Sequence, residues 1–104
     1  MIEQKAAFSR ALKLTEVGDY EGALREFIWL HDNPHPTDPS SEMFRRANGF
    51  LAWAMLGNLY PPAVEKMRSL LAQKVTHLRL FPDDKRASAD AGAMQQALAT
   101  CAGT

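Results

Sequence analysis

The sequence predicts an all-α fold made of two antiparallel helical hairpins and a final capping helix. Apolar residues recur at helical spacing along nearly the whole chain of 104 residues, and no segment alternates apolar and polar residues as a β-strand does. Glycine and proline turns divide the chain into five helical segments. A turn motif with tyrosine and alanine occurs twice, so we expect two hairpins of similar construction within one domain over residues 1–104.

The first hairpin is expected over about residues 2–32. The apolar stripe of its first helix, about residues 2–17, consists of Ala7, Ala11 and Leu14. Gly18 ends this helix, because glycine tolerates the positive φ found just beyond a helix C-terminus. Asp19 then caps the second helix, about residues 20–31, by accepting a backbone N–H.

A proline-rich linker over residues 33–39 separates the hairpins, since closely spaced prolines cannot continue a helix. The second hairpin covers about residues 40–79. Its first helix, about residues 39–56, starts with a proline after a capping aspartate and is the most apolar segment, so we expect it to be packed on two sides. Its second helix covers about residues 61–78. The alanine-rich capping helix follows over about residues 84–100.

The two turns are related by an internal repeat that aligns residues 18–24 with residues 58–64. Tyrosine then falls on tyrosine and alanine on alanine, forty positions apart. A small side chain at Ala23 and Ala63 lets two helices approach closely, and a large residue further on fills the space beyond it. We therefore expect both alanines to be buried and the tyrosine of each turn to pack across its two helices.

This pattern resembles the tetratricopeptide repeat. The run Gly-Asp-Tyr-x-x-Ala-Leu at residues 18–24, followed by Phe27, is similar to the turn and second helix of that motif. The sequence departs from the motif at Ala7, where a large aromatic is usual, and in its interval of forty residues instead of thirty-four. The Leu-Gly-x-x-Tyr-Pro-Pro-Ala run within residues 50–63 is also similar to a group of small bacterial helical proteins. The resemblance implies a right-handed stack of hairpins.

The same resemblance implies a module that binds another protein. In this family the first helix of each hairpin lines a concave groove. The corresponding partner-binding residues of this chain are Lys5, Phe8, Leu12, Arg45, Asn48, Ala52 and Met55. Their mixture of apolar, basic and amide groups suits a short extended or helical peptide of a protein partner. Alternatively, Phe8, Leu12 and Met55 pack against the final helix.

Two tryptophans are further candidates for a partner surface. Trp29 and Trp53 qualify because tryptophan is enriched in interface hot spots, although both fit a core in which each indole N–H meets a backbone carbonyl. Because two repeats bury little surface, the fifth helix or a second copy of the chain in a homodimer must cover the exposed end. A toxin-neutralising or immunity-type protein, which inhibits a partner enzyme by stoichiometric binding, is the alternative function.

Neither a metal site nor an active site is expected. The one concentration of metal-capable side chains consists of His31, Asp32, His35 and Asp38. The spacing of its histidines suits zinc on a helix, but Pro34 and Pro36 remove that helix, so we expect a solvated loop without metal or cofactor. No serine or cysteine has a base beside it. His77 stands alone near a helix C-terminus, and Asp83 and Asp84 stand at a helix start, where the helix dipole favours each.

Composition excludes several other classes of protein. Twelve Lys and Arg residues balance twelve Asp and Glu residues, whereas a nucleic-acid binder normally concentrates positive charge. Residues 1–5 contain no apolar run of signal-peptide type, and no apolar stretch is long enough to span a bilayer. Cys101 is the single cysteine, so no intramolecular disulfide can form. We therefore expect a cytoplasmic protein that binds neither nucleic acid nor membrane.

Overall fold

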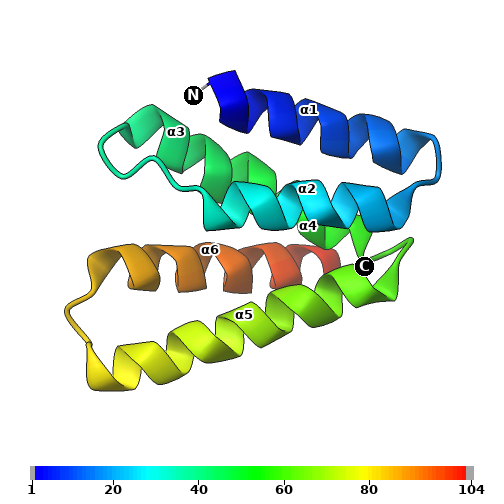
Figure 1. Ribbon diagram of the computed structural model, residues 1–104. Coiled ribbons are helices and arrows are strands. Elements are labelled where there is room, and N and C mark those ends of the chain that lie inside the picture. Colours follow the sequence, from blue (N-terminus) through cyan, green and yellow to red (C-terminus); the bar gives the residue numbers. More distant parts are fainter. Residues whose placement is uncertain (1, 103–104) are drawn as a thin grey trace.

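The computed structural model describes residues 2–102, and within them the chain forms an all-α compact domain with no strand (Figure 1). Three consecutive elements, α3, η1 and α4, continue one another without a break, and we call them together the third helix. The chain thus has five helices over the described residues. Their bounds are α1 Ile2–Glu16, α2 Tyr20–Asp32, α3 Pro39–Phe44, η1 Arg45–Gly49, α4 Phe50–Leu56, α5 Pro61–Leu80 and α6 Lys85–Ala102. The predicted fold class, all-α, is confirmed.

The helices are arranged in layers in a molecule of 41 × 30 × 19 Å. Figure 1 shows α1 on one side and α5 on the other, with α2 and α6 between them. The helix α1 packs on α2, while α6 packs on both α4 and α5. The third helix and α6 run in the same direction, so both helices begin at the same end of the molecule (Figure 1).

The helix starts follow local sequence signals. Asp19 accepts a hydrogen bond from the Gly22 backbone N–H at 3.0 Å, as predicted for the cap of α2. Asp38 accepts from the Ser41 N–H at 3.2 Å, just before the proline that begins α3. Gly18 has a φ of +86°, which an L-residue with a side chain rarely adopts, and this residue ends α1 as expected.

The core is built from small residues at the closest helix contacts and aromatic residues around them. Ala23 and Ala63 are both fully buried. Trp53 is 1% exposed, stacks on Phe27 and donates its Nε1–H to the carbonyl oxygen of Ala63 at 2.8 Å. Its interpretation as a core residue is therefore confirmed, and a role for it on a partner surface is wrong. Trp29, by contrast, is exposed.

The third helix departs from the regular α-helix that the sequence predicts over residues 39–56. Its middle, Arg45–Gly49, is a π-helical turn, which is wider than an α-helical turn and shifts the register of the residues around it. The chain passes close to α2 here, because a Cβ added at Gly49 would lie 2.8 Å from Cδ2 of Leu30. None of the helices within the described residues is both long and apolar enough to cross a membrane.

Candidate functional site

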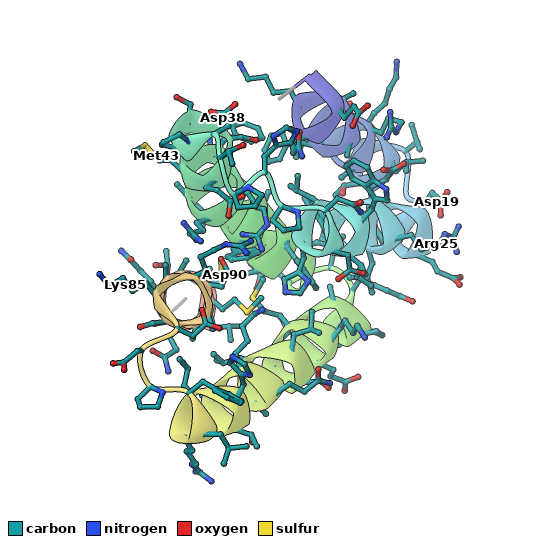
Figure 2. All side chains as sticks on the ribbon, turned by 60° about the vertical axis from the view of Figure 1, so that its left-hand side comes forward. Asp19, Arg25, Asp38, Met43, Lys85 and Asp90 are labelled. Carbon is teal, nitrogen blue, oxygen red and sulfur yellow. The ribbon has the colours of Figure 1, made fainter. Side chains whose placement is uncertain are left out.

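An apolar groove lies between the third helix and α6, with a volume of about 690 Å³. Met43, Ala47 and Leu51 form its wall on the third helix, and Ala93 and Ala97 face them from α6. Figure 2 shows Met43 at the outer side of α3, where its side chain meets solvent. Since Met43 is 70% exposed and Leu51 37% exposed, the groove is open along its length.

Helical spacing places these apolar residues in a row. Met43, Ala47 and Leu51 follow one another at intervals of four on the third helix, as Ala93 and Ala97 do on α6. The alanines are too small to fill the space between the two helices, so the groove stays empty where larger side chains would close it. Contiguous apolar surface of this kind is typical of an interaction site.

Charged residues line only one end of the groove, where α3 and α6 begin. Its lining residues there are Pro36, Pro39, Glu42, Arg46 and Arg86. At the opposite end the polar residues are Gln96 and Thr100, which carry no charge. The groove therefore has a charged end and a neutral end.

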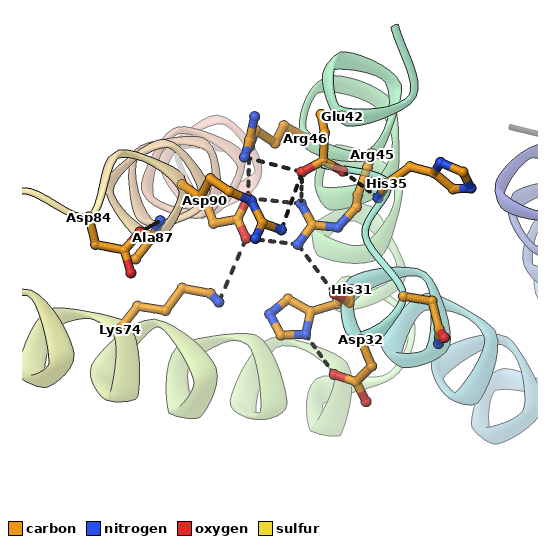
Figure 3. A network of polar contacts seen from close by, with 12 residues as sticks. His31, Asp32, His35, Glu42, Arg45, Arg46, Lys74, Asp84, Ala87 and Asp90 are labelled. Carbon is orange, nitrogen blue, oxygen red and sulfur yellow. Dashed lines mark hydrogen bonds and ion pairs between the residues drawn. The ribbon is translucent and has the colours of Figure 1, made fainter. Parts of the chain in front are cut away.

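Behind the charged end lies a buried ion pair between Arg45 of the third helix and Asp90 of α6 (Figure 3). The guanidinium donates from both Nη atoms to the two carboxylate oxygens, at 2.8 and 2.7 Å. Arg46 donates from Nε to the same carboxylate at 2.7 Å. Burial alone would raise the pKa of Asp90, but the hydrogen bonds and charges of Arg45 and Arg46 outweigh burial and hold its pKa at about 2.

Five further contacts extend this pair into a network. The second carboxylate, Glu42, accepts the His35 backbone N–H at 3.0 Å, and its Oε1 lies 3.4 to 3.8 Å from three arginines. Lys74 of α5 places Nζ 3.7 Å from Asp90. We call this group the ion cluster; its members are Glu42, Arg45, Arg46, Lys74, Arg86 and Asp90. It ties the third helix, α5 and α6 together.

His31 lies against the ion cluster, and it differs from the loop histidine that the sequence predicts. Its side chain is only 11% exposed, and its ring contacts Phe50 and Trp53. Nδ1 lies 2.8 Å from a carboxylate oxygen of Asp32, whereas Nε2 is buried with no hydrogen-bond partner. Burial lowers the pKa of His31, the hydrogen bond that its ring makes to the Asp32 carboxylate opposes this, and the positive charges of Lys74 and Arg45 lower the pKa further.

The four metal-capable residues of the linker region do not converge. His31 is packed against aromatic rings, His35 is exposed, and Asp38 caps α3. Across residues 2–102 no group of three or more His, Cys, Asp and Glu side chains is placed to hold a metal ion. His77, expected to stand alone, places Nε2 2.8 Å from Oδ2 of Asp84 instead.

The structure separates the partner-binding residues that the sequence predicts. Arg45 departs from the prediction, because its guanidinium is 2% exposed and held within the ion cluster, where no groove ligand can reach it. The ring of Phe8 contacts Phe44 of α3 and Phe27 of α2, while α6 lies beyond α2 in Figure 1. Phe8 therefore packs on these two helices and not on the final helix.

The other predicted partner-binding residues lie on α1 and on the third helix, and none of them lines the apolar groove. Lys5, Leu12, Asn48 and Met55 are exposed, and Ala52 is half-buried. Their role in partner binding stays a prediction. Sequence reasoning missed the groove itself, although the apolar spacing of Met43, Ala47 and Leu51 was a signal that could have suggested it.

No protein-family model, no curated protein and no solved structure matches the chain. The fold and the site together define it as a small all-α protein whose third helix and α6 leave an apolar groove uncovered, with an ion cluster behind one end.

Proposed function

We propose that the protein is an interaction module that binds an apolar helical segment of a partner protein in the groove between the third helix and α6. The observation that carries this proposal is the row of exposed Met43, Ala47 and Leu51 facing Ala93 and Ala97 across about 690 Å³ of open space. Burial of one large apolar side chain in such a groove contributes roughly 1.5–3 kcal/mol to binding.

The small residues of the groove favour a helix as the occupant. A helix packs well between two parallel helices when alanines of these helices leave space for its own large side chains, which recur at intervals of three and four residues. Ala47, Ala93 and Ala97 offer such positions. Met43 at the rim has a flexible, polarisable side chain that adapts to an apolar surface laid against it.

A repeat arrangement is part of the proposal. In it, α1–α2 and the third helix with α5 are two tetratricopeptide-like units in a right-handed stack, and α6 caps the second unit. Three observations support this. Ala23 and Ala63 are both fully buried, Phe27 and Met67 are buried four residues beyond them, and the rings of the two turn tyrosines lie 6.2 Å apart. The groove then lies between the first helix of the second unit and the cap.

The test compares two methionines on the same helix. Peptides that bind the full-length chain are first selected from a display library of random 20-residue sequences, and their affinity is measured by fluorescence anisotropy. Met43→Glu should weaken binding at least roughly tenfold, because it places a charge at the rim of the apolar groove. Met55→Glu is the matched control, since Met55 is also exposed but lies outside the groove.

The control also tests the surface that the sequence predicts. If Met55→Glu weakens binding and Met43→Glu does not, the partner uses the surface around Met55, and the groove proposal is wrong. If no peptide is enriched, a binding function for the groove fails. Thermal unfolding of both variants should match the wild type within a few degrees, because both side chains are largely exposed.

A further inference from the structure

We infer that the partner helix carries an aspartate or glutamate side chain at the charged end of the groove, and that Arg86 is the residue that selects it. This inference rests on the proposed function. It starts from the asymmetry of the groove, which is neutral at the end bounded by Thr100 and charged at the end where α3 and α6 begin. A partner segment therefore has one preferred direction in the groove.

The charges at that end do not balance. Four cationic side chains of the ion cluster surround two carboxylates, Glu42 and Asp90, so the cluster has an excess of two positive charges. The nearby Asp38 and Asp84 accept hydrogen bonds from the first turns of α3 and α6, respectively, and so face their own helices. The excess positive charge attracts a carboxylate and repels a basic partner segment.

Of the cations in the ion cluster, Arg46 and Arg86 line the groove, and of these two Arg86 is the one available to a ligand. Arg45 is buried with both Nη atoms bound to Asp90, and Arg46 donates to Asp90 at 2.7 Å and to Glu42 at 3.4 Å. The Arg86 side chain is 54% exposed, and its contact with Glu42 is 3.8 Å long, beyond hydrogen-bond distance. Its guanidinium can therefore donate two hydrogen bonds to a partner carboxylate without breaking an internal hydrogen bond.

The neighbouring carboxylate, Glu42, does not compete with a partner carboxylate for Arg86. Glu42 is buried, with Oε2 accepting the His35 N–H and Oε1 shared among three guanidinium groups, so it is already surrounded by donors. A partner carboxylate would thus meet Arg86 at the groove surface as a second acceptor. Since this contact is partly shielded from water by the apolar groove, we expect it to change affinity by roughly tenfold.

The experiment is a double-mutant cycle on a peptide that is selected with the wild-type chain. In the library each peptide is attached to its carrier through its C-terminus, so that only side-chain carboxylates are available. The selected peptides should share an acidic residue at a constant distance from their apolar residues. Replacing that acid by its amide should weaken binding to the wild type roughly tenfold and leave binding to Arg86→Gln unchanged. Arg79→Gln, the same change at an exposed arginine of α5, should behave as the wild type does.

The outcomes separate this inference from the proposed function. If the selected peptides share no acid, or if the amide peptide loses as much affinity for Arg86→Gln as for the wild type, the selective role of Arg86 is refuted. The groove proposal is still supported in that case provided that Met43→Glu weakens binding at least roughly tenfold. If Met43→Glu has no effect, the groove proposal itself fails. A dimer in sedimentation that Met43→Glu dissociates would identify a second copy as the occupant and overturn both.

Discussion

Asp90 compensates the positive charge of the buried Arg45 side chain. A guanidinium that is only 2% exposed needs an opposite charge in good geometry, and the two-bond contact with Asp90 supplies it. The contact joins residues 45 positions apart in the sequence and so fastens α6 to the third helix. Its strength follows from this geometry, whereas an exposed ion pair such as that of Arg25 with Glu21 contributes little.

Asp90→Asn should destabilise the fold by about 3 kcal/mol, because it leaves Arg45 buried without a compensating charge. Urea unfolding followed by circular dichroism measures this loss. Asp83→Asn is the control, since Asp83 is exposed, and its effect should stay within about 0.5 kcal/mol. A loss below about 1 kcal/mol for Asp90→Asn would mean that the ion pair does not hold α6 in place.

The same carboxylate predicts a loss of stability in acid. The pKa of Asp90 is about 2 in the folded chain against 3.8 for the ordinary side chain, so the unfolded chain takes up the proton first as the pH falls. The stabilisation is therefore fully present above about pH 5 and is lost between about pH 4 and pH 2, amounting to about 2 kcal/mol. Urea midpoints measured across this range should fall more steeply for the wild type than for Asp90→Asn.

His31 predicts a second change nearer to neutral pH. Because its pKa is lowered in the folded chain, the unfolded chain binds the proton first, and stability falls as the pH drops below about 6.5. His31→Phe keeps a ring against Phe50 and Trp53 and should abolish this dependence between pH 7 and pH 5. His35→Gln, a change at an exposed histidine, should retain it. Equal slopes for all three proteins would rule out a role for His31.

At the scale of the helices, Gly57 and Gly92 differ in what an added side chain would meet. Gly57 follows α4, and a Cβ there would clash with Cγ2 of Val64 on α5 and lie 3.0 Å from the Ala54 carbonyl oxygen. Gly92 lies within α6, where a Cβ would meet no atom within 4 Å. One glycine is therefore required by the packing of α4 on α5, and the other only weakens its own helix.

Gly57→Ala should destabilise the fold by about 1–3 kcal/mol through overpacking. Gly92→Ala, the matched change, should stabilise it by about 0.5–1 kcal/mol, because alanine loses less backbone entropy in a helix. Thermal unfolding of the two variants and the wild type measures both effects. If the two substitutions change stability in the same direction, the distance between α4 and α5 is not set at Gly57.

The π-helical turn connects these local features to the site. It occupies Arg45–Gly49, and the two arginines at its start both reach the carboxylate of Asp90. After the turn the helix continues with Phe50 and Trp53 in the core. A wider turn changes the register between the two halves of the helix. One half therefore contributes side chains to the ion cluster, and the other half contributes side chains to the core. π-turns of this kind occur frequently at functional sites.

At the scale of the whole molecule, the contact between the two tyrosine turns joins the start of α2 to the start of α5. The rings of Tyr20 and Tyr60 lie 6.2 Å apart, and both side chains are half-buried. The turns after α1 and α4 lie at the end of the molecule opposite to the connection between α2 and α3 (Figure 1). Ring pairs of this geometry contribute beyond the area they bury.

A double-mutant cycle tests this connection. Tyr20→Leu and Tyr60→Leu should each destabilise the fold, and their effects should fall short of additivity by about 0.5–1 kcal/mol. The pair Tyr20→Leu with Phe81→Leu is the control, because Phe81 is exposed in the turn between α5 and α6 and should add independently. Additive effects for the tyrosine pair would show that the two turns do not stabilise each other.

The sequence by itself determined the helices, their caps and much of the core. Helix formation depends on contacts within about four residues, so the periodic apolar residues, the Asp19 and Asp38 caps and the Gly18 terminus could be predicted without a tertiary structure. The burial of Ala23 and Ala63 followed from the same spacing. For these features the prediction agrees with the structure because each depends on one short segment of sequence or on a turn motif that occurs twice in the sequence.

Only the tertiary structure decided which helix faces meet. The contact of Arg45 and Arg46 with Asp90 spans more than forty residues, and no local pattern pairs these side chains. The π-turn and the groove between Met43 and Ala97 likewise depend on how closely the third helix packs on α2 and α6. Which helix faces meet depends on the combined packing of side chains that are distant in sequence. For this reason the sequence prediction placed Arg45 on a surface, although this residue belongs to the interior.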